Sequence, residues 1–282
     1  MKKNTVATLL EMKRRGEKIS QVTSYDYSTA RLVDAAGINT VLVGDSLGMT
    51  MQGYEDTLPV TMDEMVVYGR SVGRACKNTF VILDMPFMSY QVSVEQAVAN
   101  AGRLMKETGA NAVKLEGGKR VCPQIKAITE CGIPVCAHIG MTPQSVNAFG
   151  GFKVQGKGEE NARRVLEDAL AVQEAGAFMV VLECVPPKLA ALITKKVHMI
   201  TIGIGGGAGC DGQVLVYQDM LGMSGDFVPK FVKQFANVGQ IMTQAFQAYD
   251  AEVKAGTFPD ASHSYVKSDC SDDFLAQLDQ DY

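Results

Sequence analysis

The sequence predicts a single α/β domain folded as a (β/α)8 barrel, and its strand-like runs and their polar ends favour this fold. Short apolar runs suited to buried strands alternate along the 282 residues with segments of helical periodicity. Four of these runs end on a carboxylate, which suits a barrel because its active site lies where the strands end. A doubly wound sheet is the main alternative, but it gathers its polar strand ends at one crevice. We therefore prefer the barrel.

The first half of the chain is expected to supply a leading helix and four strands. Residues 5–15 carry apolar side chains at helical spacing before Gly16, and this helix is expected to cap the barrel base. Capping boxes are expected at Thr61 and Ser93, because each is followed three residues later by Glu or Gln. The expected elements are helix 5–15, strand 19–24, helix 27–36, strand 41–45, a helix from 61, strand 81–84, a helix from 93 to Gly109 and strand 111–117.

The second half is expected to complete the barrel and to end in a tail. Residues 139–158 show no periodicity, and a connection of this length is expected to be a mobile cover over the site. The barrel should span residues 1–258, followed by an acidic and partly mobile tail over 259–282. The expected elements are a helix around Ile125 and Ile128, strand 133–138, helix 159–175, strand 180–183, helix 187–195, strand 199–203, strand 214–217 and helical segments over 228–254.

Composition excludes several classes of function. The net charge of −4 and the scattered basic residues argue against a nucleic-acid-binding protein and favour small-molecule partners. No apolar run is long enough to cross a membrane, and charged residues interrupt the first apolar segment before it could form a secretory leader. The seven cysteines include no C-x-x-C pair, so we expect buried reduced thiols and a cytoplasmic location.

The strand over residues 111–117 carries two charges on one face. Side chains alternate in a strand, so Lys114 and Glu116 should share the interior face of the barrel. Asp45 and Asp84 end the two preceding strands, which makes three neighbouring carboxylates. Such carboxylates repel one another unless a hard divalent cation binds them, and Mg²⁺ is the expected ion. The alternative is that each carboxylate caps a helix or pairs with a surface arginine.

Three further strand-end residues have candidate roles. Lys114 is placed to meet an anionic substrate oxygen near the metal, although a buried ion pair with Asp84 or Glu116 is the structural alternative. Glu183, two strands farther round, is a candidate general base, and its alternative is an ordinary ion pair. His138 lies between these groups and is expected to support them without contacting substrate or metal directly.

Two glycine-rich stretches imitate nucleotide-binding motifs. Residues 151–157 nearly spell a phosphate-binding loop, but Gly158 replaces the required Ser or Thr and no strand precedes it. Residues 203–209 resemble a dinucleotide fingerprint, yet no full helix follows. Nucleotide binding is therefore not expected, and the second set of glycines should instead allow close backbone approach.

Together, several segments resemble the ketopantoate hydroxymethyltransferase family. They occur in order along most of the chain, while the N-terminal helix and the acidic tail contribute little to the resemblance. Gly206 departs from the Ala usual in the family, which affects only local loop geometry. The matching segments are Val43–Gly48, Asp84–Phe87, Lys114–Gly117, His138–Gln144, Phe149–Gly156, Glu183 and Cys210–Val216.

The resemblance implies a barrel of the phosphoenolpyruvate/pyruvate superfamily type that converts 3-methyl-2-oxobutanoate to 2-dehydropantoate. It implies one Mg²⁺ per subunit, 5,10-methylenetetrahydrofolate as the one-carbon donor, and a homo-oligomer, with a homodecamer as the candidate state. Asp45, Asp84 and Glu116 match the metal-site positions, and Glu183 matches the proton acceptor. The positions that match contacts to the keto acid are Asp45, Ser46, Asp84 and Lys114.

Two other functions are compatible with parts of this pattern. One is another magnesium-dependent carbon–carbon lyase acting on 2-oxo acids, but the Lys-Cys-Gly-His loop of the isocitrate lyase type is absent. The other is a folate- or keto-acid-binding scaffold without catalysis. The intact carboxylates argue against a scaffold, because unused interior charges would only destabilise the barrel.

Overall fold

The computed structural model describes residues 3–225, 228–265, 267 and 269–282 and contains a closed barrel of eight parallel strands. Each strand pairs with the next one along the chain, and β8 pairs with β1 to close the ring. The predicted barrel is therefore confirmed. The strands are β1 (Ile19–Thr23), β2 (Thr40–Val43), β3 (Phe80–Asp84), β4 (Ala112–Glu116), β5 (Val135–Gly140), β6 (Met179–Glu183), β7 (Ile200–Ile204) and β8 (Gly212–Leu215).

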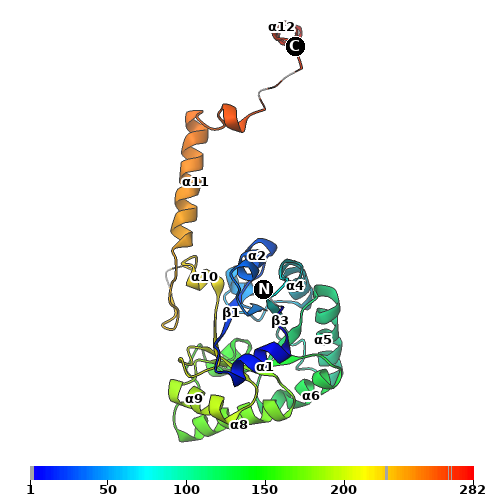
Figure 1. Ribbon diagram of the computed structural model, residues 1–282, viewed down its shortest axis with the longest axis vertical. Helices are drawn as coiled ribbons and strands as arrows, with labels where there is room; N and C mark the ends of the chain where they lie inside the picture. Colours follow the sequence, from blue (N-terminus) through cyan, green and yellow to red (C-terminus); the bar gives the residue numbers. More distant parts are fainter. Residues whose placement is uncertain (1–2, 226–227, 266, 268) are drawn as a thin grey trace. The chain divides into compact units, whose positions relative to one another are not determined.

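Helices connect most of the consecutive strands, and Figure 1 shows α4, α5, α6, α8 and α9 following one another around the outside of the barrel. The helices before β5 are α1 (Val6–Arg14), α2 (Tyr27–Ala35), α3 (Leu47–Thr50), α4 (Met62–Ala75), α5 (Val94–Thr108), the 3-10 turn η1 (Lys119–Val121) and α6 (Cys122–Glu130). Those after β5 are η2 (Pro143–Ser145), α7 (Val146–Phe149), α8 (Glu159–Glu174), α9 (Pro187–Lys196), α10 (Tyr217–Met220), α11 (Val238–Ala255), η3 (Ala261–His263) and α12 (Asp272–Asp281).

Local sequence signals explain where two of these helices begin. At α4 the predicted capping box is complete, since Glu64 N–H donates to Thr61 Oγ1 at 3.3 Å and Thr61 N–H donates to Glu64 Oε2 at 2.7 Å. At α5 only half of it forms. Ser93 Oγ accepts from Gln96 N–H at 3.1 Å, but Gln96 Oε1 finds no partner among the described residues. The second capping box is therefore corrected to a simple N-cap.

The N-terminal helix closes the base of the barrel, as predicted. Leu9 is completely buried and packs in one core cluster with Ile19 and Ile200 from the lower part of the barrel. Lys13 Nζ reaches Asp211 Oδ2 at 2.7 Å and so fixes α1 beside β8. Because the base is filled with apolar side chains, the polar strand ends gather at the opposite, carboxyl end.

The last strand begins earlier than the sequence indicated. β8 starts at Gly212 rather than Val214, and Tyr217 opens helix α10 instead of ending the strand. Gly212 pairs with Ile19, and a Cβ at this glycine would lie only 2.2 Å from the carbonyl oxygen of Ile19. The strand therefore requires glycine at this position for close backbone approach. Because glycine is a poor strand former, the start of β8 could not be predicted from strand propensity.

The segment over 139–158 is more ordered than a structureless cover. Its first two residues continue β5 to Gly140, and Met141 and Gln144 are buried. The short helices η2 and α7 follow, so only the later part of the segment is largely exposed. Buried side chains and strand pairing fix the first part, which restricts the expected cover to residues 146–158.

The chain divides into two compact units. The first comprises Met1–Met220 and Ser224–Gln234, and the second comprises Leu221–Met223 and Phe235–Tyr282. The boundary expected from the sequence lies after residue 258, whereas the second unit already includes α11, which has no buried residue. The expected tail contains η3 and α12, because Ser271 accepts from Phe274 N–H at the start of α12 and acidic residues occupy its first turn.

The cysteines agree only in part with the buried reduced thiols expected from composition. Cys136 and Cys210 are buried thiols as expected, but Cys131 is exposed. Within the described ranges, no helix combines the length and apolar character that crossing a membrane requires.

Candidate active site

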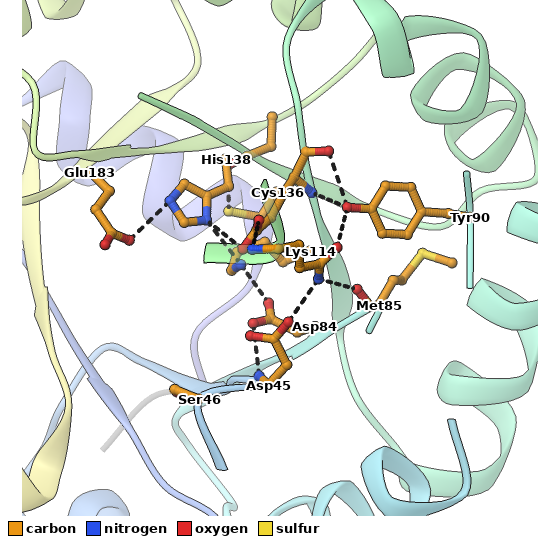
Figure 2. Close-up of polar contacts among 12 residues, drawn as sticks. Asp45, Ser46, Asp84, Met85, Tyr90, Lys114, Cys136, His138 and Glu183 are labelled. Carbon is orange, nitrogen blue, oxygen red and sulfur yellow. Dashed lines mark hydrogen bonds and ion pairs between the residues drawn. The ribbon is translucent and has the colours of Figure 1, made fainter. Parts of the chain in front are cut away.

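The strand register brings the predicted site residues side by side at the carboxyl end of the barrel. Asp84 of β3 pairs with Lys114 of β4, and Glu116 of β4 pairs with His138 of β5. Glu183 ends β6 opposite Gly140 of β5. Figure 2 shows the side chains of Asp84, Lys114, His138 and Glu183 converging from neighbouring strands. Consecutive strands therefore present a continuous row of charged groups.

Lys114 and Asp84 form a buried ion pair. Lys114 Nζ lies 2.8 Å from Asp84 Oδ1, and both side chains are almost fully buried. Burial opposes the charge on Lys114, but the carboxylates of Asp84, Glu116 and Asp45 outweigh it and raise the lysine pKa. Burial raises the pKa of Asp84, and Lys114 offsets only part of that effect. Lys114 therefore stays cationic over the physiological range.

Asp45 experiences strong electrostatic repulsion. Its backbone N–H donates to Asp84 Oδ2 at 3.1 Å, which places the two carboxyl groups at adjoining strand ends. Burial, followed by the charges of Asp84 and Glu116, raises the pKa of Asp45 well above its usual value. A divalent cation bound here would relieve this repulsion, and Mg²⁺ commonly takes one or two carboxylates together with water or substrate oxygens. The donor set of Asp45 and Asp84 fits that ion.

Glu116 is committed to different partners. Its Oε2 accepts the Gln144 backbone N–H at 2.9 Å, and its Oε1 lies 3.5 Å from His138 Nδ1. Burial raises the pKa of Glu116, but His138 and Lys114 more than compensate and lower it. Across the described ranges, no three His, Cys, Asp or Glu side chains are grouped so as to hold a metal ion. A direct contact between Glu116 and the metal stays a prediction.

His138 lies between two carboxylates, in the position expected from the strand order. Its Nε2 is 3.2 Å from Glu183 Oε2, opposite the Nδ1 that faces Glu116. Burial and the nearby Lys114 disfavour its charged form, but Glu116 and Glu183 prevail and raise the His138 pKa to about 9. The two carboxylates therefore favour the cationic imidazole, although its Nδ1 also lies 3.3 Å from Lys114 Nζ.

The row carries an excess of negative charge. Four carboxylates, those of Asp45, Asp84, Glu116 and Glu183, face two cations, Lys114 and His138. When all four are ionised, a formal charge of about −2 remains, which is the charge that a divalent cation neutralises. The chemistry of this buried row therefore favours a site for a divalent ion and an anionic ligand together.

Ser46 occupies the edge of the same site. Its Oγ lies 2.8 Å from the hydroxyl of Tyr25, a completely buried side chain. Ser46 directly follows Asp45 and is the N-cap residue of the short helix α3. Tyr25 was not predicted, because a tyrosine after an apolar strand gives no sign that its hydroxyl will contact a serine at the end of the neighbouring strand.

A cavity of about 150 Å³ lies over this row. Asp45, Ser46 and Asp84 line it, and so do Glu116 and Glu183. The same cavity also has an apolar wall and two aromatic side chains from loops. These residues are Leu42, Val181, Ile204, Val214, Val216, Phe152 and Phe231. The cavity therefore has one charged wall and one apolar wall.

Sequence reasoning missed two residues that support the row. Gln144 Nε2 donates to Asp45 Oδ2 at 2.8 Å, and Tyr90 OH contacts both Glu116 N–H and Gln144 Oε1. Gln144 lies within the segment His138–Gln144 that carries the family resemblance, which is the only signal that could have found it. Both residues come from loops, where periodicity gives no information about direction.

Comparison with known proteins adds three findings. The sequence profile of the family described as ketopantoate hydroxymethyltransferase matches residues 3–261. A 3-methyl-2-oxobutanoate hydroxymethyltransferase of Clostridium novyi (strain NT) is 64% identical over 263 residues, covering 93% of this chain and 96% of that protein. The enzyme of the same name from Enterococcus faecalis is 60% identical over 276 residues, covering 98% and 99%.

Solved structures show a similar fold at low sequence identity. A 2,3-dimethylmalate lyase, described as a member of the PEP mutase/isocitrate lyase superfamily, has a TM-score of 0.59 and 15% identity, covering 98% of this chain and 95% of its own. A phosphonopyruvate hydrolase in complex with oxalate and Mg²⁺ has a TM-score of 0.59 and 11% identity with the same coverage. These likenesses show the barrel fold alone.

Proposed function

The chain belongs to the ketopantoate hydroxymethyltransferase family, and from this premise we propose that it transfers a hydroxymethyl group from 5,10-methylenetetrahydrofolate to 3-methyl-2-oxobutanoate. The C3–H bond of the keto acid breaks, and C3 bonds to the methylene carbon of the folate. Water supplies the hydroxyl group, and tetrahydrofolate leaves as the carbon–nitrogen bonds to the methylene carbon break. The product is 2-dehydropantoate, on the route to pantothenate.

The observation that carries this proposal is the buried row of charges from Asp45 to Glu183. Asp45 and Asp84 would hold Mg²⁺, with Glu116 completing the predicted metal site beside them. When bound, this ion supplies Lewis acidity that makes the C3 proton of a 2-oxo acid easier to remove. The negative potential of the row supports one Mg²⁺ per subunit.

Lys114 and Ser46 are proposed to bind the keto acid. Lys114 is fixed by its 2.8 Å ion pair with Asp84, so its ammonium is already oriented before a ligand arrives. It would stabilise negative charge that develops on the keto oxygen as C3 loses its proton. Ser46 lines the same cavity and would donate its hydroxyl hydrogen to a substrate oxygen, together with contacts from Asp45 and Asp84.

Glu183 is proposed to remove the C3 proton. It lines the cavity from β6, on the far side of His138 from Glu116. The contact of 3.2 Å between His138 Nε2 and Glu183 Oε2 orients one carboxylate oxygen and leaves the other for the substrate. The apolar wall around Val181 and Phe152 would exclude water from the reacting carbon.

We also propose that the protein acts in the cytoplasm as a homo-oligomer, with a homodecamer as the state that the family implies. Helix α11 supports self-association, because it exposes Ile241, Phe246 and Tyr249. The scattered charge and the small cavity, with one charged and one apolar wall, support small-molecule substrates rather than nucleic acid or membrane.

The test is an assay of the purified protein with both substrates, with and without Mg²⁺. Mass spectrometry should detect 2-dehydropantoate only when keto acid, folate and Mg²⁺ are all present. In D₂O without folate, Mg²⁺-dependent exchange at C3 should proceed, whereas a binding scaffold would show neither exchange nor product. Cleavage of a 2-oxo acid without folate would instead identify a carbon–carbon lyase.

A further inference from the structure

Gln144 uses all the hydrogen-bonding capacity of its buried carboxamide. Its Nε2 donates to Asp45 Oδ2 at 2.8 Å and to the backbone oxygen of Met85 at 3.0 Å. Its Oε1 accepts from Tyr90 OH at 2.7 Å and from Gln91 Nε2 at 3.2 Å. Because an amide has two donor hydrogens and one acceptor oxygen, these contacts leave no hydrogen of the group unsatisfied.

The orientation of this amide is fixed by its partners. The Met85 carbonyl can only accept, so the amide nitrogen must face it and Asp45. The Tyr90 hydroxyl, which also accepts Glu116 N–H at 3.0 Å, is held on the oxygen side. If the amide were rotated by half a turn, its oxygen would face two acceptors, the Met85 carbonyl oxygen and Asp45 Oδ2. Gln144 therefore has one favourable orientation in the folded protein.

Gln144 contacts two of the three carboxylates predicted at the metal site. Its side chain holds Asp45, while its backbone N–H donates to Glu116 Oε2 at 2.9 Å. Asp45 Oδ1 accepts no hydrogen bond from the residues that the structure describes, although Asp45 lines the central cavity. The amide thus occupies one oxygen of Asp45 and leaves the other available.

We propose that Gln144 is a positioning residue for the metal site, which holds Asp45 so that only Oδ1 is presented to the divalent cation. Its backbone N–H keeps Glu116 beside His138. This inference rests on the proposed function, because it assumes that a divalent cation binds at Asp45. Partners that hydrogen-bond a metal ligand orient it, and removing them typically costs about 10- to 100-fold in metal affinity or activity.

The test compares Gln144→Met with Gln21→Met. Met keeps the volume of the side chain and removes its hydrogen bonds. Gln21 is a matched control, since it is 5% exposed where Gln144 is 6% exposed, and its carboxamide forms no hydrogen bond with any residue that the structure describes. Mg²⁺ affinity is measured by titration calorimetry without substrate, and folding is checked by urea unfolding.

Gln144→Met should weaken Mg²⁺ binding by about 10- to 100-fold, while Gln21→Met should bind like the wild type. Turnover of Gln144→Met should recover at saturating Mg²⁺, and Tyr90→Phe, which removes the hydroxyl that holds Gln144 Oε1, should show a smaller loss of affinity. If folded Gln144→Met bound Mg²⁺ like the wild type and lost only stability, the residue would be structural and the inference overturned. If the wild-type protein bound no divalent ion, the proposed magnesium-dependent function would fall as well.

Discussion

Lys114 Nζ lies 2.8 Å from Asp84 Oδ1, and the two residues are paired across the end of the barrel where β3 meets β4. A buried pair of this kind contributes little net stability against an apolar pair, but removing one partner leaves an uncompensated charge. Without Lys114, the negative charge of Asp84 would face the carboxylates of Asp45 and Glu116, which both repel it. We therefore expect Lys114 to stabilise the folded protein, in addition to the role proposed for it in binding the keto acid.

Lys114→Met should lower the free energy of unfolding by about 3–5 kcal/mol in metal-free buffer, as expected for breaking a buried pair. Mg²⁺ should restore part of the loss, because the ion would supply the missing positive charge and bind only the folded state. Urea unfolding with EDTA and with Mg²⁺ measures both effects. Lys126→Met, changed at an exposed lysine of α6, should show neither. Unchanged stability in EDTA would contradict the role given to Lys114.

Asp84→Asn should abolish magnesium-dependent turnover while leaving the barrel folded. The variant keeps the shape of the side chain but removes one of the two carboxylates proposed as metal ligands. Titration calorimetry should show Mg²⁺ binding weakened beyond measurement, and EDTA treatment of the wild type should give the same loss of activity, restored by Mg²⁺. Asp63→Asn, at an exposed position of α4, is the control. Normal turnover of Asp84→Asn in Mg²⁺ would make the metal assignment wrong.

His138 should make stability depend on pH. Glu116 and Glu183 overcome burial and Lys114 to raise its pKa to about 9, above the usual value near 6.5. A pKa raised by folding contributes stability that is complete below the unfolded pKa and is lost as pH rises through the folded pKa. The contribution is on the order of 3 kcal/mol, at 1.36 kcal/mol for each pKa unit.

Without metal, the difference in unfolding free energy between wild type and His138→Gln should therefore shrink from pH 6 to pH 10. Urea unfolding across this range measures it. His198→Gln, changed at an exposed histidine, serves as the control for histidine loss elsewhere. A difference that stays constant or grows with pH would show that His138 is not held as a cation between the two carboxylates.

Strand ends made the charged row predictable. Asp84, Lys114, Glu116 and Glu183 follow apolar runs in the sequence, and the alternation of side chains puts them on the interior face. Once the barrel is correct, the register that pairs Glu116 with His138 follows from the strand order. The positions of these charged residues could therefore be predicted from the local sequence pattern and the strand order alone.

The supporting contacts could not be predicted in the same way. Gln144 and Tyr90 lie after β5 and β3, and their side chains meet only because the two loops fold over the same strand end. A loop residue carries no periodicity, so its direction depends on the tertiary structure. The start of β8 was missed for a related reason, since Gly212 is chosen for its close approach to Ile19 rather than for strand propensity.

The later part of the β5–α8 connection should become protected when substrates bind. Phe152 lines the cavity yet is 58% exposed, so residues 146–158 have apolar surface that a ligand could cover. Hydrogen exchange should slow across this range with keto acid and folate present, while Met141 and Gln144 should be slow throughout because they are already buried. Equal exchange with and without ligands would leave residues 146–158 as a static loop.

Glu183→Gln should separate proton removal from ligand binding. The variant keeps the size of the side chain and can still contact His138 Nε2, which lies 3.2 Å from Glu183 Oε2, but it cannot accept the C3 proton. Mg²⁺ and keto acid should still bind, because Asp45, Asp84 and Lys114 are unchanged. General-base catalysis contributes about 10²- to 10⁴-fold, so turnover and C3 exchange in D₂O should both fall on that order.

The matched control is Glu174→Gln, changed at the end of α8 away from the barrel interior, which should leave exchange and turnover unchanged. NMR of the keto acid in D₂O follows exchange without folate, and mass spectrometry follows transfer with it. If exchange continued at the wild-type rate in Glu183→Gln while transfer was lost, Glu183 would act in the folate step. The base would then have to be sought at a bound water, or at the neutral form of His138, which lies beside Glu183 in the row.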